Sequence, residues 1–312
     1  MRKSKETLLS RHTGPISILL ILALLASGCS IKKVAVNAMA DAMAQSGDTY
    51  AGDNDIDFVG QATPFGLKTM EGLLQETPEH RGLLLAATRG FTQYAYVFIE
   101  QPANEIEPFD VALAYRQRNR ARLMYLRARD YGLRGLEAQH PQVSTAILRN
   151  PDEALSAATL EDVPLLYWTA AAWASSISLS RDDPAAVADL PVVEALIKRA
   201  LALDESFDRG ALHVFLVSYE MGQSGLREGS ERRARQHFNR ALELSNGMQA
   251  APYLAHAEAI SIANNNRAEY ERMLNDALAV DVDADPQNRL ANLVMQRRAR
   301  WLLANRDLYF LE

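Results

Sequence analysis

The sequence has a single cysteine, Cys29, among its 312 residues. No disulfide can therefore form within the chain, and the fold has to be held together by packing even in an oxidising compartment. The sequence also lacks any stretch in which β-branched and polar residues alternate, so we predict no β-sheet. Glycine and proline are sparse, with 16 and 12 copies. Long Ala- and Leu-rich stretches without either residue favour helices.

A long hydrophobic run is missing as well. The apolar run of residues 16–26 is only 11 residues long, whereas a transmembrane helix needs roughly 20. It follows a basic stretch at residues 2–11, and this order of basic and apolar segments is typical of a signal peptide. We therefore predict that residues 1–28 are a cleaved signal.

The lone cysteine follows three small residues, Ala26, Ser27 and Gly28. This pattern resembles the lipobox of bacterial lipoproteins, although leucine is commoner than Ala26 at its position. The resemblance implies lipidation of Cys29 and a firm anchor through several acyl chains; the alternative is an ordinary buried cysteine after a signal anchor. Ser30, where inner-membrane retention would require Asp in enterobacteria, favours the outer membrane. We expect a periplasm-facing lipoprotein.

The charge of the chain argues against polyanionic partners. The net charge is −6, and removal of the basic signal makes the remainder more acidic. Nucleic acid and anionic lipid surfaces attract basic proteins. We therefore expect no nucleic-acid partner, and contact with the membrane through the lipid anchor only.

The usual motifs of enzymes and metal sites are absent from the sequence. It contains no GxSxG elbow, no GxxxxGK[ST] phosphate loop and no HExxH pair. The acidic stretches beginning at Asp53 and Asp281 imitate the start of a calcium loop, but the glycine at the sixth position and the glutamate at the twelfth are missing from both. We predict no catalytic site, no metal and no cofactor.

What the sequence does contain is helical periodicity and an internal repeat. Ala200, Ala241 and Ala277 close similar segments at spacings of 41 and 36 residues, close to the 34 of tetratricopeptide repeats (TPRs). Between Gly222 and Asn246 the spacing of small and aromatic residues resembles one such repeat, with Gly222 and Ala234 at the predicted close contact of two helices.

These patterns predict an all-α, TPR-like α-solenoid of about four helical hairpins. A leading helix at 64–76 and a closing helix at about 286–305 would flank them. Residues 29–60 are predicted as a lipidated tether with a short helix, and 61–312 as the repeat domain. A generic helical bundle is the alternative.

Aromatic side chains of this domain are candidates for a ligand groove, with an arginine to hold a carboxylate. Packing of the same side chains in the core is the alternative. The candidate residues are Tyr94, Phe98, Arg122, Tyr125, Tyr167, Trp168 and Trp173.

Three segments together resemble a known family: PFGLKTMEGLLQETPEHRGLLLAATRGFTQYAYVF, RARLMYLRARDYGLRGLE and LLYWTAAAWA. Over residues 29–305 the chain is similar to the T component of TRAP transporters. The resemblance implies a periplasmic lipoprotein that assembles as a homotrimer around a pore. Its partner would be the periplasmic solute-binding P component of an importer of organic acids. Only Cys29 maps onto the family as a functional residue.

Two other functions remain open from the sequence. A general TPR scaffold for envelope or outer-membrane protein assembly would explain the repeat and the lipobox equally well. A lipid or peptidoglycan hydrolase would need a polar site, and the sequence offers none.

Overall fold

The computed structural model describes residues 32–222 and 228–310. The predicted signal peptide 1–28 and the predicted lipidation site Cys29 lie outside this part of the chain. All regular structure in the described part is helical, with no β-strand, which confirms the all-α prediction. None of these helices combines the length and the hydropathy needed to span a membrane.

The helices succeed one another along the chain with short connections. The first covers residues 32–45, and the others are α2 (Gly47–Ala51), α3 (Ile56–Glu76), α4 (Arg81–Ala95), α5 (Gln101–Ile106), α6 (Val111–Glu137), α7 (Val143–Ala146), α8 (Pro151–Ala154), α9 (Val163–Ser178), α10 (Pro184–Val187), α11 (Leu190–Leu203), α12 (Ala211–Gly222), α13 (Ser230–Ser245), α14 (Ala251–His256), α15 (Arg267–Ala279) and α16 (Arg289–Ala304). Two π-helical turns continue α4 and α14, namely η1 (Tyr96–Glu100) and η4 (Ala257–Ser261).

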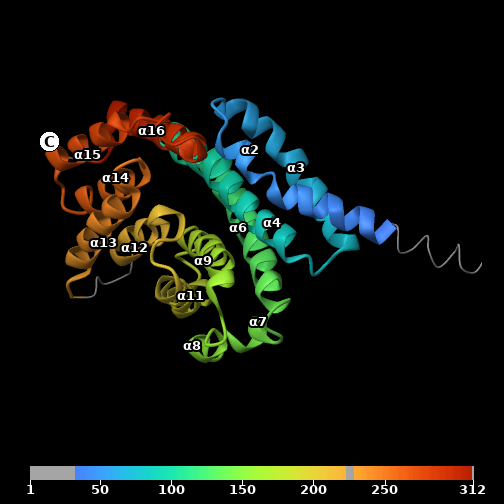
Figure 1. Cartoon of the computed structure of the whole chain (residues 1–312). Coiled ribbons are helices and arrows are strands. Elements are labelled where there is room, and N and C mark those ends of the chain that lie inside the picture. Colours follow the sequence, from blue (N-terminus) through green and yellow to red (C-terminus); the bar gives the residue numbers. More distant parts are fainter. Residues whose placement is uncertain (1–31, 223–227, 311–312) are drawn as a thin grey trace, which may run out of the picture.

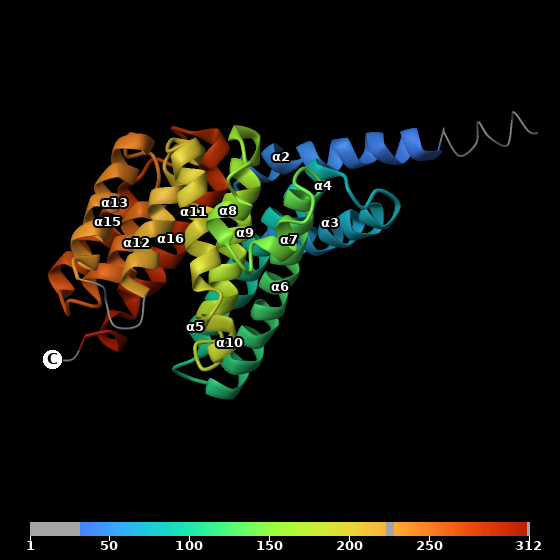
Figure 2. The ribbon, with the colours of Figure 1, turned by 90° about the horizontal axis from the view of Figure 1, so that it is seen from below.

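The segment predicted as a tether is more ordered than expected. Residues 32–45 form a helix in which Ala40 is fully buried in a cluster with Leu67 and Leu84. The leading helix, α3, begins at Ile56 and not at 64, because the side chain of Asp55 caps it by accepting hydrogen bonds from the first backbone amides. The helix 32–45 lies at one end of the molecule, and α13 and α15 at the other (Figures 1 and 2).

The centre of the fold is the packing of α6 against α4 and α9. Two glycines make this approach possible. A Cβ on Gly132 would lie 2.1 Å from Thr169 Oγ1, and one on Gly135 would lie 2.7 Å from Leu165 Cδ2, both on α9. Gly132 also follows Tyr125 and Ala128 on the buried face of α6. The segments of α6 and α9 that carry the family resemblance therefore pack against each other in one close helix–helix contact.

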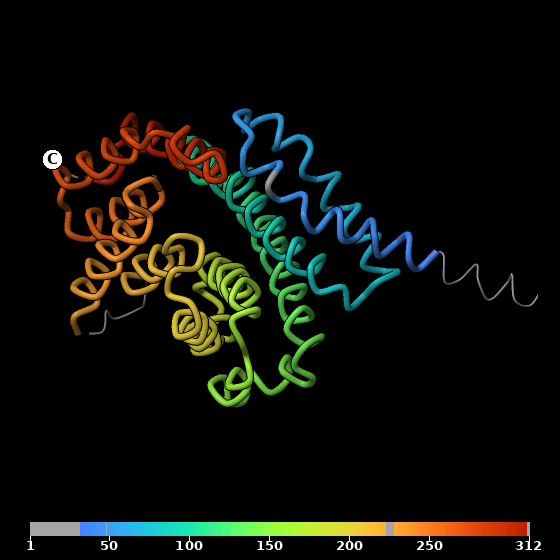
Figure 3. Tube along the Cα trace, viewed as in Figure 1, coloured from blue at the N-terminus to red at the C-terminus, as the bar shows by residue number. Residues whose placement is uncertain are grey.

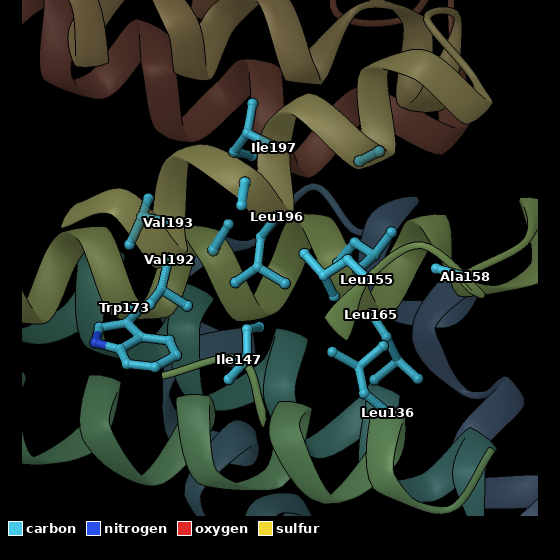
Figure 4. Close-up of a cluster of buried hydrophobic side chains, with 14 of the residues drawn as sticks. Leu136, Ile147, Leu155, Ala158, Leu165, Trp173, Val192, Val193, Leu196 and Ile197 are labelled. Carbon is cyan, nitrogen blue, oxygen red and sulfur yellow. The ribbon is translucent and has the colours of Figure 1, made fainter. Parts of the chain in front are cut away.

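The second face of α9 packs against α11 in the largest apolar cluster (Figure 4). The Trp173 ring lies beside Val192, while Leu165 reaches toward Leu136 of α6. These side chains are nearly inaccessible to solvent, with Trp173 at 3% exposure. Burying them supplies the main favourable free energy of this region.

The repeat is visible as helical hairpins in the C-terminal half. α12 pairs with α13, and α14 with α15, and the repeated alanines Ala200, Ala241 and Ala277 are all fully buried. The interpretation of Gly222 as a close helix contact is wrong, because a Cβ there would meet nothing nearer than Arg181 Nη2 at 3.9 Å. The small residue that α13 buries is Ala234.

The array of helices closes on itself. α16 runs back to contact α2 and α3 (Figures 1 and 3). Arg289 Nη1 donates a hydrogen bond to the Gly52 carbonyl at 3.0 Å, and Arg297 Nη1 lies 3.4 Å from Asp57 Oδ1. The closing helix was predicted at about 286–305 and is found at Arg289–Ala304, preceded by a 3-10 turn. Its return to the N-terminal helices was not predicted.

Candidate ligand cavity

The closed array surrounds a cavity of about 1450 Å³. Its wall is built from helices that are far apart in sequence, including α3, α4, α9, α12, α14 and α16. Small-molecule pockets usually measure roughly 300–1,000 Å³. The cavity is therefore large enough for a small solute together with water.

Four of the predicted groove residues line this cavity: Tyr94, Phe98, Tyr167 and Trp168. The Tyr94 and Phe98 rings are 5.6 Å apart, and a Cβ on Gly60 of α3 would lie 2.5 Å from the Phe98 ring. A glycine at position 60 thus allows the ring to lie flat against α3.

The other three predicted groove residues are placed outside the cavity wall. Trp173 is buried in the core and donates its indole N–H to Asp189 Oδ2 at 3.1 Å. Tyr125 is fully buried and donates its hydroxyl to Glu100. Arg122 donates to Asn119 Oδ1 on its own helix at 3.2 Å. For Trp173, the alternative of core packing is the one that the structure supports.

One polar part of the wall is formed by the two π-helical turns and α16. Glu100 belongs to η1, and Glu258 to η4. Arg298 of α16 donates through Nη2 to Glu258 Oε1 at 2.8 Å. Burial raises the pKa of Glu100, although the Tyr125 hydroxyl and the Arg118 charge act in the opposite direction. π-helical turns are frequent at functional sites, and here both direct an acidic residue toward one cavity.

A second part of the wall is aromatic and acidic. Tyr167 lies 5.0 Å from Trp168 in an edge-on arrangement and 5.4 Å from Phe207, between ring centroids. Asp208 follows Phe207, and all four residues line the cavity. Asp208 is exposed to this cavity. Desolvation by the surrounding protein nevertheless raises the pKa of its carboxyl group, against the opposing charges of Arg89 and Arg209.

The backbone that presents Asp208 is unusual. Asp208, Arg209 and Gly210 all have positive φ angles, of 44°, 54° and 94°. Left-handed backbone costs a non-glycine residue roughly 1–2 kcal/mol, and such strain clusters at functional sites. Glycine is needed at 210, because its φ is positive and a Cβ would lie 3.2 Å from Ala241 Cα.

Two guanidinium groups reach the cavity, those of Arg89 on α4 and Arg181 after α9. Neither forms an ion pair with a side chain that the structure describes. Arg89 lies so close to α2 that a Cβ on Gly47 would come within 1.8 Å of its Nη2 atom. Arg89 therefore offers a positive charge to the cavity without a carboxylate partner in the described residues.

The sequence reasoning missed Arg89, Phe207, Asp208, Glu258 and Arg298 as residues of the site. No motif surrounds them, and they lie on elements that are far apart in the sequence. One local signal was available for Asp208: the run Phe207, Asp208, Arg209, Gly210 ends on a glycine between two helices. This pattern is typical of a turn with positive φ angles.

The family model of the TRAP transporter T-component matches residues 52–310. The chain belongs to this family. The T component aligns with an uncharacterized protein of Treponema pallidum (strain Nichols) at 28% identity over 307 residues, which is 93% of this chain and 95% of the relative. The family predicted from the three segments is confirmed. As a T component, the protein is an accessory part of a transport system and not an enzyme.

Proposed function

We propose that this T component is held at the membrane by lipid on Cys29, faces the periplasm and binds the periplasmic solute-binding protein of its TRAP system. The cavity binds an organic-acid or apolar solute while the two proteins are in contact. Membership of the family supports the transport role. The lipobox sequence supports the anchor, and Ser30 after the cysteine favours the outer membrane.

The observation that supports solute binding in the cavity is the position of Arg89. Its guanidinium faces the cavity with no ion pair among the described side chains. An arginine binds a carboxylate through two parallel N–H donors. The adjoining wall includes apolar side chains such as Val59, Leu67 and Phe98. A carboxylate with an apolar body matches both features.

We further propose that the protein is a homotrimer. Large apolar side chains are exposed on α3 and around the start of α6, including Phe65 at 80% exposure and Phe109 at 79%. Contiguous exposed apolar surface marks contacts between proteins. These side chains are candidates for contacts with a second subunit or with the solute-binding protein.

Native mass spectrometry tests the assembly and the partner together. The soluble chain from Ser30 would be measured alone and with a periplasmic solute-binding protein of a TRAP system from the same organism. We expect a trimer, and a further mass that corresponds to the complex. A strictly monomeric chain at micromolar concentration would contradict the trimer. A trimer without any complex would instead favour the general scaffold.

The anchor is tested by Cys29→Ala. Without the thiol no acyl chains can be attached, so we expect the variant to move from the membrane fraction to the soluble periplasmic fraction. Immunoblotting of the fractions measures this. Retention of the variant in the membrane would refute the proposed anchor.

A further inference from the structure

The aromatic and acidic part of the wall, which we call the Asp208 corner, consists of Tyr167, Trp168, Phe207 and Asp208. The centroid of the Tyr167 ring lies 5.0 Å from that of Trp168 and 5.4 Å from that of Phe207. All three are only partly buried, and the side chain of Asp208 is exposed to the cavity. The corner is therefore open to a ligand, unlike the core around Trp173.

The Asp208 carboxylate differs from the other acids of the cavity in having no partner. Glu258 accepts hydrogen bonds from Arg298, and Glu100 accepts one from Tyr125. Among the described residues, no side chain forms a hydrogen bond or an ion pair with the Asp208 carboxylate. Because Asp208 is exposed to the cavity, its carboxylate can bind a cation from outside the chain.

The cationic side chains of the described residues do not pair with the Asp208 carboxylate. Arg209 is directed to Asp285, with which it forms an ion pair. Arg89 lowers the pKa of Asp208 through its charge, but the two side chains form no ion pair within 4.0 Å. The arginines thus stabilise the ionised form of Asp208 from a distance and leave its oxygen atoms free.

Aromatic faces beside a carboxylate suit one class of ligand. The faces of Trp and Tyr rings carry partial negative charge and attract organic ammonium groups, whose alkyl substituents also pack against the rings. An inorganic cation would gain little from three aromatic rings. The strained backbone at Asp208 fits the same conclusion, since it fixes the carboxylate beside the rings before any ligand arrives.

We propose that the Asp208 corner binds the organic ammonium group of the solute that occupies the cavity. This inference rests on the proposed function only in taking the cavity as the place of the solute. If Arg89 holds a carboxylate, the solute is a zwitterion with an ammonium and a carboxylate group. The proposal of an ammonium subsite does not depend on the contact between Arg89 and a carboxylate.

Two probes of nearly the same shape separate charge from apolar packing. Choline carries a trimethylammonium group, and in 3,3-dimethylbutan-1-ol a neutral carbon replaces the nitrogen. We expect the purified full chain to bind choline in isothermal titration calorimetry, and to bind the neutral alcohol at least about tenfold more weakly. Equal affinity for the two probes, or no binding of choline, would overturn the proposal.

Variants then locate the site. Asp208→Asn keeps the shape of the side chain and is suited to left-handed backbone, so we expect normal folding by circular dichroism and about a tenfold loss of choline affinity. Trp168→Leu should cause a similar loss. Glu79→Gln, which removes an exposed charge outside the cavity wall, should bind choline as the wild type does.

The variants also separate this inference from the proposed function. Asp208→Asn should still form the complex with the solute-binding protein in native mass spectrometry. Unchanged choline affinity in Asp208→Asn would refute the ammonium subsite while leaving the transport role intact. If the wild-type chain forms no complex with the solute-binding protein, the proposed transport partner is refuted, whereas the choline measurements remain valid.

Discussion

At the scale of single residues, identical side chains have opposite surroundings. Trp168 and Trp173 lie on one helix, five positions apart, yet Trp168 lines the cavity and Trp173 is in the core. The sequence placed both in an aromatic cluster, because helical periodicity gives relative directions but does not say which direction faces an internal space. Four of the seven predicted groove residues line the cavity; whether they bind a ligand stays a prediction.

Glycine shows the same dependence on surroundings. Gly132→Ala would place a methyl group 2.1 Å from Thr169 Oγ1, whereas Gly72→Ala on α3 would meet nothing within 4 Å. We expect Gly132→Ala to lower the free energy of unfolding by about 1–3 kcal/mol. Gly72→Ala should raise it by up to about 1 kcal/mol, because alanine favours the helix.

Urea denaturation monitored by circular dichroism checks both glycine variants. Gly72→Ala serves as the matched control, since both substitutions add the same methyl group within a helix. Equal unfolding midpoints for the two variants would show that α6 and α9 are not packed as closely as described.

At the scale of elements, the boundaries follow local signals, and the sequence anticipated many of them. Asp110 caps α6 and Asn266 caps α15, each by accepting a hydrogen bond from a backbone amide. The π-helical turns were not anticipated, because a single inserted residue leaves no mark on the periodicity. Residues 32–45 are also more ordered than the sequence indicated. The sign of this order is the burial of Ala40 against other helices, which no local sequence pattern shows.

The hairpin of α12 and α13 contains a pair of histidines that should respond to pH. His213 Nδ1 and His237 Nδ1 are 2.8 Å apart, and His213 Nε2 lies 3.1 Å from Glu205 Oε1. Burial lowers the pKa of both imidazoles below the ordinary 6.5, and for His237 the charge of His213 lowers it further. The unfolded chain therefore binds protons more readily than the folded chain.

From this we expect a defined pH dependence of stability. The contribution of the pair to the free energy of unfolding is fully present above pH 6.5 and is lost as the pH falls toward the lowered pKa values. His237→Gln removes one of the two groups, so its stability should decline less steeply between pH 7.5 and 5. Urea midpoints at each pH measure this, and identical slopes for variant and wild type would contradict it.

At the scale of the whole molecule, the closure of the array depends on a few polar contacts of α16. Arg289 donates hydrogen bonds to the Gly52 carbonyl and to Asp283 Oδ1. Arg300 on the same helix is exposed and forms no side-chain hydrogen bond or ion pair among the described residues. This closure could not be predicted from the sequence, because residues 52 and 289 share no local pattern. Their contact is fixed only by the accumulated geometry of the helices between them.

We expect Arg289→Ala to loosen the closure. Amide hydrogen exchange in α2 and in the first turn of α16 should become about tenfold faster, as loss of a hydrogen bond of roughly 1 kcal/mol or more implies. Arg300→Ala is the matched control and should leave the exchange rates unchanged. Slow exchange at both places in Arg289→Ala would mean that apolar contacts alone hold the array closed.

The return of α16 to the N-terminal helices also has a consequence for folding. The hairpins are local and can form as soon as their own residues are present, but the cavity exists only after α16 has docked against α2 and α3. Joining segments that are 237 positions apart costs chain entropy, and a solute that binds only the closed form repays part of that cost by mass action. Ligand and closure are therefore thermodynamically linked, so a tightly bound solute would favour the state in which α16 is docked against α2 and α3.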